Sequence, residues 1–100
     1  MTTKVIFRRT TTNALIDEVI AVFPAMAGDC NPYTTCLSYV HMGQHGAMAI
    51  DYMKDTSPAN FQEYYPLMKE LESIGYDDLQ VAKRFSRKDL QARINQTDGK

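Results

Sequence analysis

Hydrophobic and polar residues alternate along the chain in short blocks, and the blocks near its start predict two strands. The first covers Lys4–Arg9, because the β-branched and aromatic run Val5–Phe7 is bracketed by charge. Polar, turn-prone residues follow at Thr10–Asn13. A second apolar run predicts a strand over Glu18–Phe23, and Pro24 ends it because proline cannot donate to a sheet ladder.

Three further strands are predicted after a loop over residues 24–34. Thr35–Met42 is the third strand, and Ala47–Met53, with its alternating apolar side chains, is the fourth. Gly43-Gln44-His45-Gly46 between them predicts a hairpin turn, because two glycines can supply positive φ angles. Leu79–Phe85 predicts a fifth strand that returns to the sheet.

A helix is predicted over Ser57–Gly75. Asn60 with Glu63 forms a capping signal at its start, and Gly75 lies where a helix commonly ends. Pro66 falls inside this span, so we expect a continuous but kinked helix. Apolar residues recur at helical spacing along it, at Phe61, Tyr64, Tyr65, Met68, Leu71 and Ile74.

The order β-β-β-β-α-β predicts an α+β fold, with an antiparallel sheet of about five strands and the main helix on one face. A second capping signal at Ser86 and Asp89 predicts a short C-terminal helix through Ile94. We expect one domain over residues 1–95 and a frayed polar tail over residues 96–100.

The apolar strands also predict self-association. Val5–Phe7 and Val19–Phe23 are apolar at consecutive positions, so both faces of the sheet carry apolar side chains, as in sheets buried on both faces. One helix covers one face, and the basic residues Arg87, Lys88 and Arg93 make the terminal helix a poor cover for the other. We therefore expect a homodimer or a larger homo-oligomer.

Composition narrows the class of protein. The chain has 100 residues, of which 44% are hydrophobic and 23% are charged, as in globular domains. Its net charge of −1 argues against bulk binding of nucleic acid, where basic residues supply most of the affinity. No apolar run is long enough for a membrane span or a signal peptide, so we expect a cytoplasmic protein without a membrane partner.

The turn at residues 43–46 is the leading candidate for a ligand site. Its glycines allow close backbone approach, its polar side chains offer donors and acceptors, and the flanking tyrosines could stack on a ring. A basic segment at residues 83–93, with Arg8 and Arg9 beside it in the sheet, could hold phosphate or could equally dock on an acidic surface of another protomer. The alternatives are a plain hairpin turn and a solvated charged face. The expected ligand-binding residues are Tyr39, His41, Gly43, Gln44, His45, Gly46, Tyr52, Arg8 and Arg84.

Metal and thiol chemistry are weaker candidates. Cys30, Cys36, His41, His45 and Asp51 are all potential zinc ligands, but their spacing misses the usual short cysteine knuckle, so we expect neither metal nor cofactor. Cys36 with His41 or His45 would supply a nucleophile and a base, although Cys36 and His41 have opposite parity on one strand. Both cysteines are expected as free thiols.

Several segments carry a resemblance to a family. They are Lys4-Val5-Ile6-Phe7-Arg8, Val19-Ile20-Ala21-Val22-Phe23-Pro24, Tyr39-Val40-His41-Met42-Gly43-Gln44-His45, Leu71-Glu72-Ser73-Ile74-Gly75-Tyr76 and Val81-Ala82-Lys83-Arg84. Together they resemble a group of short, uncharacterised bacterial and phage or mobile-element proteins. The resemblance implies a phage-type or accessory protein and carries over no activity and no site residue.

The function expected from the sequence is that of a small non-enzymatic binding protein. It would self-associate and would sequester or inhibit an unidentified small-molecule ligand or host protein. One alternative is a small metal- or thiol-dependent enzyme that uses His41, His45, Asp51 and Cys36. Another is a nucleic-acid-binding module that acts through Arg8, Arg9 and the basic segment.

Overall fold

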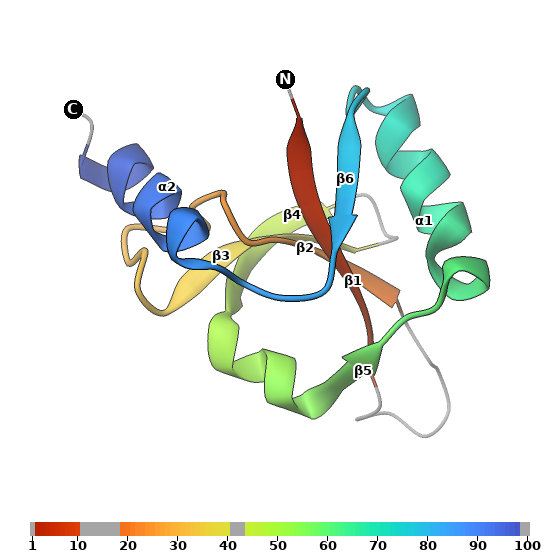
Figure 1. The fold of residues 1–100 in the computed structure, drawn as a ribbon, viewed down its shortest axis with the longest axis horizontal. Coiled ribbons are helices and arrows are strands. Elements are labelled where there is room, and N and C mark those ends of the chain that lie inside the picture. The colour runs from red at the N-terminus through yellow and green to blue at the C-terminus, as the bar shows by residue number, and fades with distance from the viewer. Residues whose placement is uncertain (1, 11–18, 41–43, 99–100) are drawn as a thin grey trace.

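The computed structural model describes residues 2–10, 19–40 and 44–98, and within them it shows a six-stranded sheet with two α-helices (Figure 1). The α+β class with a largely antiparallel sheet, a main helix and a C-terminal helix is confirmed. The elements in chain order are β1 (Thr3–Thr10), β2 (Val19–Phe23), β3 (Thr35–Val40), β4 (Gln44–Ala49), the 3-10 helix η1 (Ile50–Asp55), β5 (Thr56–Pro58), α1 (Phe61–Ser73), β6 (Leu79–Ala82) and α2 (Arg87–Asp98).

Strand β1 is central to the sheet. The order on one side of it is β2, β3 and β4, all antiparallel to their neighbours. On its other side β1 has two partners, with antiparallel β5 beside one half and parallel β6 beside the other (Figure 1). The parallel pairing of β6 departs from the expected antiparallel sheet, and it follows because the crossover through α1 brings the chain back in the direction of β1.

The predicted fourth strand, Ala47–Met53, is wrong at both ends. Strand β4 begins at Gln44 and ends at Ala49, and the chain then turns into η1. The apolar residues of η1 fold back onto the sheet, where Ile50, Tyr52 and Met53 pack against a buried cluster. The apolar residues from Ile50 onward therefore belong to a 3-10 turn that lies over the sheet, and not to a strand within it.

Helix α1 has the predicted caps. The Asn60 side chain accepts a hydrogen bond from the Glu63 N–H, and the Glu63 side chain accepts one from the Asn60 N–H, each at 2.9 Å. The helix begins at Phe61 because Thr56–Pro58 pair with β1, so the expected start at Ser57 is wrong. The helix is continuous through Pro66, as expected, and the expected kink there stays a prediction.

A glycine-based cap ends α1. Gly75 has a φ of +124°, a conformation that glycine adopts without strain. Its N–H donates to the Glu72 carbonyl at 3.2 Å, and the Tyr76 N–H donates to the Leu71 carbonyl at 3.1 Å. This pair of bonds is the Schellman arrangement, which satisfies the free carbonyls at a helix C-terminus.

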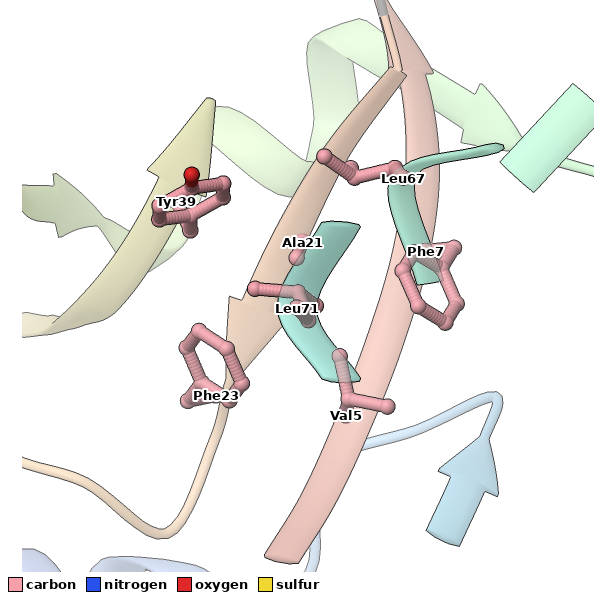
Figure 2. Close-up of a cluster of buried hydrophobic side chains, with 7 residues drawn as sticks. All are labelled: Val5, Phe7, Ala21, Phe23, Tyr39, Leu67 and Leu71. Atoms are coloured by element: carbon pink, nitrogen blue, oxygen red, sulfur yellow. The ribbon is translucent and has the colours of Figure 1, made fainter. Parts of the chain in front are cut away.

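One face of the sheet packs against α1. Leu67 and Leu71 of the helix lie over side chains of three adjacent strands, as Figure 2 shows. The Phe7 ring also stacks on Tyr64, with ring centroids 4.3 Å apart. The buried cluster contains Val5, Phe7, Ala21, Phe23, Tyr39, Leu67 and Leu71.

The opposite face is covered by the same chain. Its buried cluster contains Ile6, Ile20, Val22, Cys36 and Met48, and η1, Ala82 and Phe85 pack against it. Ile6 is only 2% exposed and Val22 is fully buried without any partner chain. The expectation that a neighbouring copy must cover this face is therefore wrong, because the chain folds its own later segments over it.

Helix α2 is held to the body by its polar residues. Lys4 Nζ lies 2.7 Å from the Asp89 carboxylate, which also accepts from the Ser86 N–H at 2.7 Å. The helix runs through Asp98, past the expected end at Ile94, into the segment expected to fray. Gln96 in that segment exchanges hydrogen bonds with the backbone of residues 25 and 27, both at 2.7 Å. Its side chain thereby fixes the last turns of α2.

Across the described ranges, neither α-helix has the length and apolar character that a membrane crossing requires.

Candidate functional site

On one side of β1, the partner strand changes at Phe7: β6 pairs with the residues before it, and β5 pairs with the residues after it. Ile6 is opposite Ala82 of β6, and Arg8 is opposite Pro58 of β5. Phe7 lies between these pairs, and its carbonyl oxygen accepts a hydrogen bond from the Ala59 N–H at 3.2 Å. Strands β5 and β6 thus end beside the same point of β1, and an opening is left in the sheet edge between them.

A groove of about 390 Å³ occupies this opening, and we call it the edge groove. This size lies within the range of protein sites for small molecules and single side chains. Residues from β1, from the link between β5 and α1, and from β6 line it: Ile6, Phe7, Arg8, Pro58, Ala59, Asn60, Phe61, Tyr64, Val81, Ala82 and Lys83.

Aromatic surface is uncovered at the edge groove. Phe61 is 57% exposed, and its ring meets Tyr64 edge-on, with centroids 5.5 Å apart. Val81 on the opposite wall is 42% exposed. Tyr65 extends this exposed surface, since its ring centroid lies 5.2 Å from that of Phe61. Single exposed apolar residues are common, but a group of them around a cavity marks an interaction site.

The charge at the edge groove is positive. The Arg8 guanidinium donates to the Thr56 hydroxyl at 2.8 Å and to the carbonyl oxygens of Thr56 and Met53 at 2.7 and 3.2 Å. These acceptors are neutral, so none of them cancels its charge. Lys83, the second cation of the groove, is exposed. In the part of the chain that the structure describes, no carboxylate lines the groove, and neither Arg8 nor Lys83 has an ion-pair partner.

The predicted site at residues 43–46 does not form as a turn in its described part. Gln44, His45 and Gly46 belong to β4, and Gly46 has no positive φ. Tyr52 lies in η1 over the opposite face from Tyr39, so the two tyrosines do not flank one site. His41 and Gly43 lie outside the described residues.

The structure does bring Tyr39 and His45 together. They are directly opposite in the β3–β4 register, with ring centroids 4.7 Å apart. His45 Nε2 also lies 2.8 Å from the Tyr76 hydroxyl. Tyr39 is only 3% exposed, and its hydroxyl donates to the Glu70 carboxylate at 2.5 Å, a bond that raises the Tyr39 pKa. Burial raises the Tyr76 pKa. These contacts tie β3 and β4 to the end of α1 and leave Tyr39 little surface for a ligand.

The thiol dyad is not formed by the described residues. Cys36 faces the cluster on one side of the sheet, whereas His45 contacts rings on the other. Burial also raises the pKa of the Cys36 thiol to about 11, which disfavours the reactive thiolate. Asp51 is exposed in η1 and pairs with Lys54 at 3.6 Å. No group of three or more potential metal ligands occurs within the described ranges.

The basic segment divides into two parts with different roles. Arg93 is buried and contacts backbone carbonyls. Lys83, Arg84, Arg87 and Lys88 are exposed. Of the expected ligand residues, Arg8 lines the edge groove and Arg84 directly follows its lining residue Lys83.

The aromatic wall of the edge groove was missed by sequence reasoning. Phe61, Tyr64 and Tyr65 belong to the apolar residues that recur at helical spacing, a pattern typical of a helix face that packs on a core. Phe61 is the first residue of α1, next to the opening beside β5, and there its ring stays exposed. A signal for this exposed position is Pro58, three residues before Phe61, because proline in a sheet favours the end of an edge strand.

Comparison with protein-family models, with curated proteins and with solved structures gave no match to this chain. The resemblance to short phage and mobile-element proteins therefore stays an expectation.

Proposed function

We propose that this protein is a small non-enzymatic binding protein and that the edge groove is its binding site. The observation that carries the proposal is the gathering of exposed Phe61 and Val81 around a cavity of about 390 Å³. Apolar surface that is already exposed gains free energy when a ligand removes it from water, by roughly 25 cal/mol per Å². Binding at such a groove occupies the partner's contacting surface, so capture alone would sequester or inhibit the partner.

A neutral aromatic probe tests the groove directly. Titration of the protein with N-acetylphenylalanine methylamide, followed by amide chemical shifts, should move the signals of Phe61, Tyr64, Val81 and Lys83. The Phe61→Ala variant should weaken these shifts. Tyr33→Ala is the matched control, because Tyr33 is a 66% exposed aromatic residue that does not line the groove. Shifts spread over the whole surface, or equal effects of both variants, would refute the proposal.

Self-association remains a separate prediction. The argument from an uncovered sheet face no longer supports it, because that face is buried within one chain. Light scattering coupled to size exclusion measures the oligomeric state, and a monomer at high micromolar concentration would reject the prediction.

A further inference from the structure

We propose that the partner of the edge groove is an extended, acidic segment of another protein. Such a segment would place one apolar side chain in the groove, set its carboxylates against the surrounding cations, and pair its backbone with the free edge of β6. This inference rests on the proposed binding function and adds the chemical class of the partner.

The first argument is charge. Arg8 and Lys83 line the groove, and none of the lining residues that the structure describes is a carboxylate. Arg84 directly follows Lys83 in the chain, is exposed, and has no ion-pair partner in the described ranges. The first turn of α1 forms the opposite wall, and the Glu63 carboxylate already caps the helix N-terminus there, so the cations of the other wall carry the charge argument. An acidic ligand therefore meets complementary charge at Arg8 and Lys83.

The second argument is the edge of β6. This strand pairs with β1 on one side, and no described strand pairs with its other side. Its residues Leu79–Ala82 contain no charge and no proline, the devices that proteins commonly use to block pairing at an edge. The neighbouring β5, by contrast, ends at Pro58. An extended peptide can add to an open edge of this kind through main-chain hydrogen bonds.

The two arguments meet at Val81. It belongs to β6, and its 42% exposed side chain lines the groove. A peptide paired with β6 would therefore run past the groove and could insert one side chain. Main-chain pairing gives affinity in this mode of recognition, and the pocket gives specificity.

A nucleic acid is the competing anionic partner, and the charge distribution disfavours it. The net charge is −1, and other cations are engaged inside the fold, since Lys4 pairs with Asp89 and Arg9 pairs with Glu63. Tracking a phosphate backbone requires a longer basic surface than these residues offer.

Fluorescence anisotropy with matched peptides tests the inference. The parent peptide has about nine residues, a central phenylalanine and flanking aspartates and glutamates. Companion peptides replace the acids by serine or by lysine. In about 0.1 M salt the acidic peptide should bind at least tenfold tighter than the serine peptide, and the lysine peptide should show no binding.

Two charge-reversal variants locate the contact. Lys83→Glu should weaken the acidic peptide about tenfold. Lys54→Glu makes the same change of charge at an exposed lysine that does not line the groove, and it should leave the affinity unchanged. An acidic peptide N-methylated at alternate residues loses its backbone donors and should also lose binding.

The outcomes separate the inference from the proposed function. Equal binding of the acidic and serine peptides would overturn the acidic partner while the groove kept its function. Equal effects of the two lysine variants would also overturn the acidic partner. If the N-methylated peptide bound with full affinity, the proposed pairing with β6 would be overturned. Tighter binding of an oligothymidylate than of the acidic peptide would assign the site to nucleic acid. Binding of no peptide, together with no response to the neutral probe, would overturn both proposals.

Discussion

Arg93 Nε on helix α2 lies 2.8 Å from the carbonyl oxygen of Pro32, and this contact fixes the loop between β2 and β3 to the end of the chain. The same guanidinium donates from Nη1 to the Pro24 carbonyl at 2.5 Å, at the other end of that loop. Arg93 is only 4% exposed and lies over the Phe85 ring at 5.6 Å. Arg93 was expected to make α2 a poor cover for the apolar face, and in the structure it fixes α2 to this loop.

Removal of this guanidinium should destabilise the fold. Arg93→Met keeps much of the side-chain volume and leaves the carbonyl groups of Pro24 and Pro32 without their donor. We expect a loss of about 2–4 kcal/mol in the free energy of unfolding, measured by urea denaturation. Arg87→Met, at an exposed position of the same helix, should change it by less than about 0.5 kcal/mol. Equal effects of the two changes would contradict the docking role.

Two glycines should respond in opposite ways to substitution by alanine. A Cβ at Gly28 would lie 2.4 Å from the Cys36 carbonyl oxygen, a backbone atom that cannot move aside cheaply, whereas a Cβ at Gly46 meets nothing within 4 Å. Gly28→Ala should cost about 1–3 kcal/mol of stability, as overpacking does. Gly46→Ala should be neutral or stabilising, because alanine reduces the entropy of the unfolded chain. Thermal denaturation of both variants provides the comparison.

The two cysteines should differ in reactivity. Cys30 is exposed, and Cys36 is buried with its thiol pKa raised to about 11. Near neutral pH, a disulfide reagent such as Ellman's reagent should label one thiol of the folded protein quickly and the second only after denaturant is added. Cys30→Ser should remove the fast phase. A fast phase that survives in this variant would show that Cys36 is accessible.

Cys36 should also make stability depend on alkaline pH. Burial raises its pKa from 9.0 to about 11, so between these values the folded state keeps a proton that the unfolded chain releases. The stabilisation is complete below pH 9, and the free energy of unfolding should fall as the pH rises through this window, by at most about 1.4 kcal/mol per pH unit. The tyrosines with raised pKa act in the same direction, so the measurement compares the protein with Cys36→Ala, which should fall less steeply. Parallel curves would contradict the assignment to Cys36.

Local signals in the sequence predicted much of the fold. The capping pair Asn60 and Glu63, the terminal Gly75 and the apolar runs of β1 and β2 act within a few residues, and each has the predicted structure. The switch from β4 to η1 was not predictable, because so short a stretch has too few apolar positions for their spacing to separate a 3-10 turn from a strand. The cover of the second face by η1, Ala82 and Phe85 depended on contacts between segments far apart in the chain, which no local pattern encodes.

The candidate site was less accessible to sequence reasoning than the fold. Arg8 was singled out for its charge, and it does line the edge groove. The groove itself forms because β5 and β6 share one side of β1 and stop on either side of Phe7. The pairing of Arg8 with Pro58 and of Ile6 with Ala82 joins residues far apart in the chain, so the hollow between them has no sequence signature of its own.

Because β5 and β6 pair with the same side of β1, that side is completed in steps during synthesis of the chain. As the polypeptide leaves the ribosome, β1 emerges before every strand that pairs with it. Of the two strands on this side, β5 emerges before α1, and β6 emerges only after α1. Pairings so distant in sequence form late and slowly. Until β6 emerges, the backbone edge of β1 at Thr3–Ile6, which carries the apolar side chains of Val5 and Ile6, lacks its partner strand. This stretch is where we expect a ribosome-associated chaperone to act.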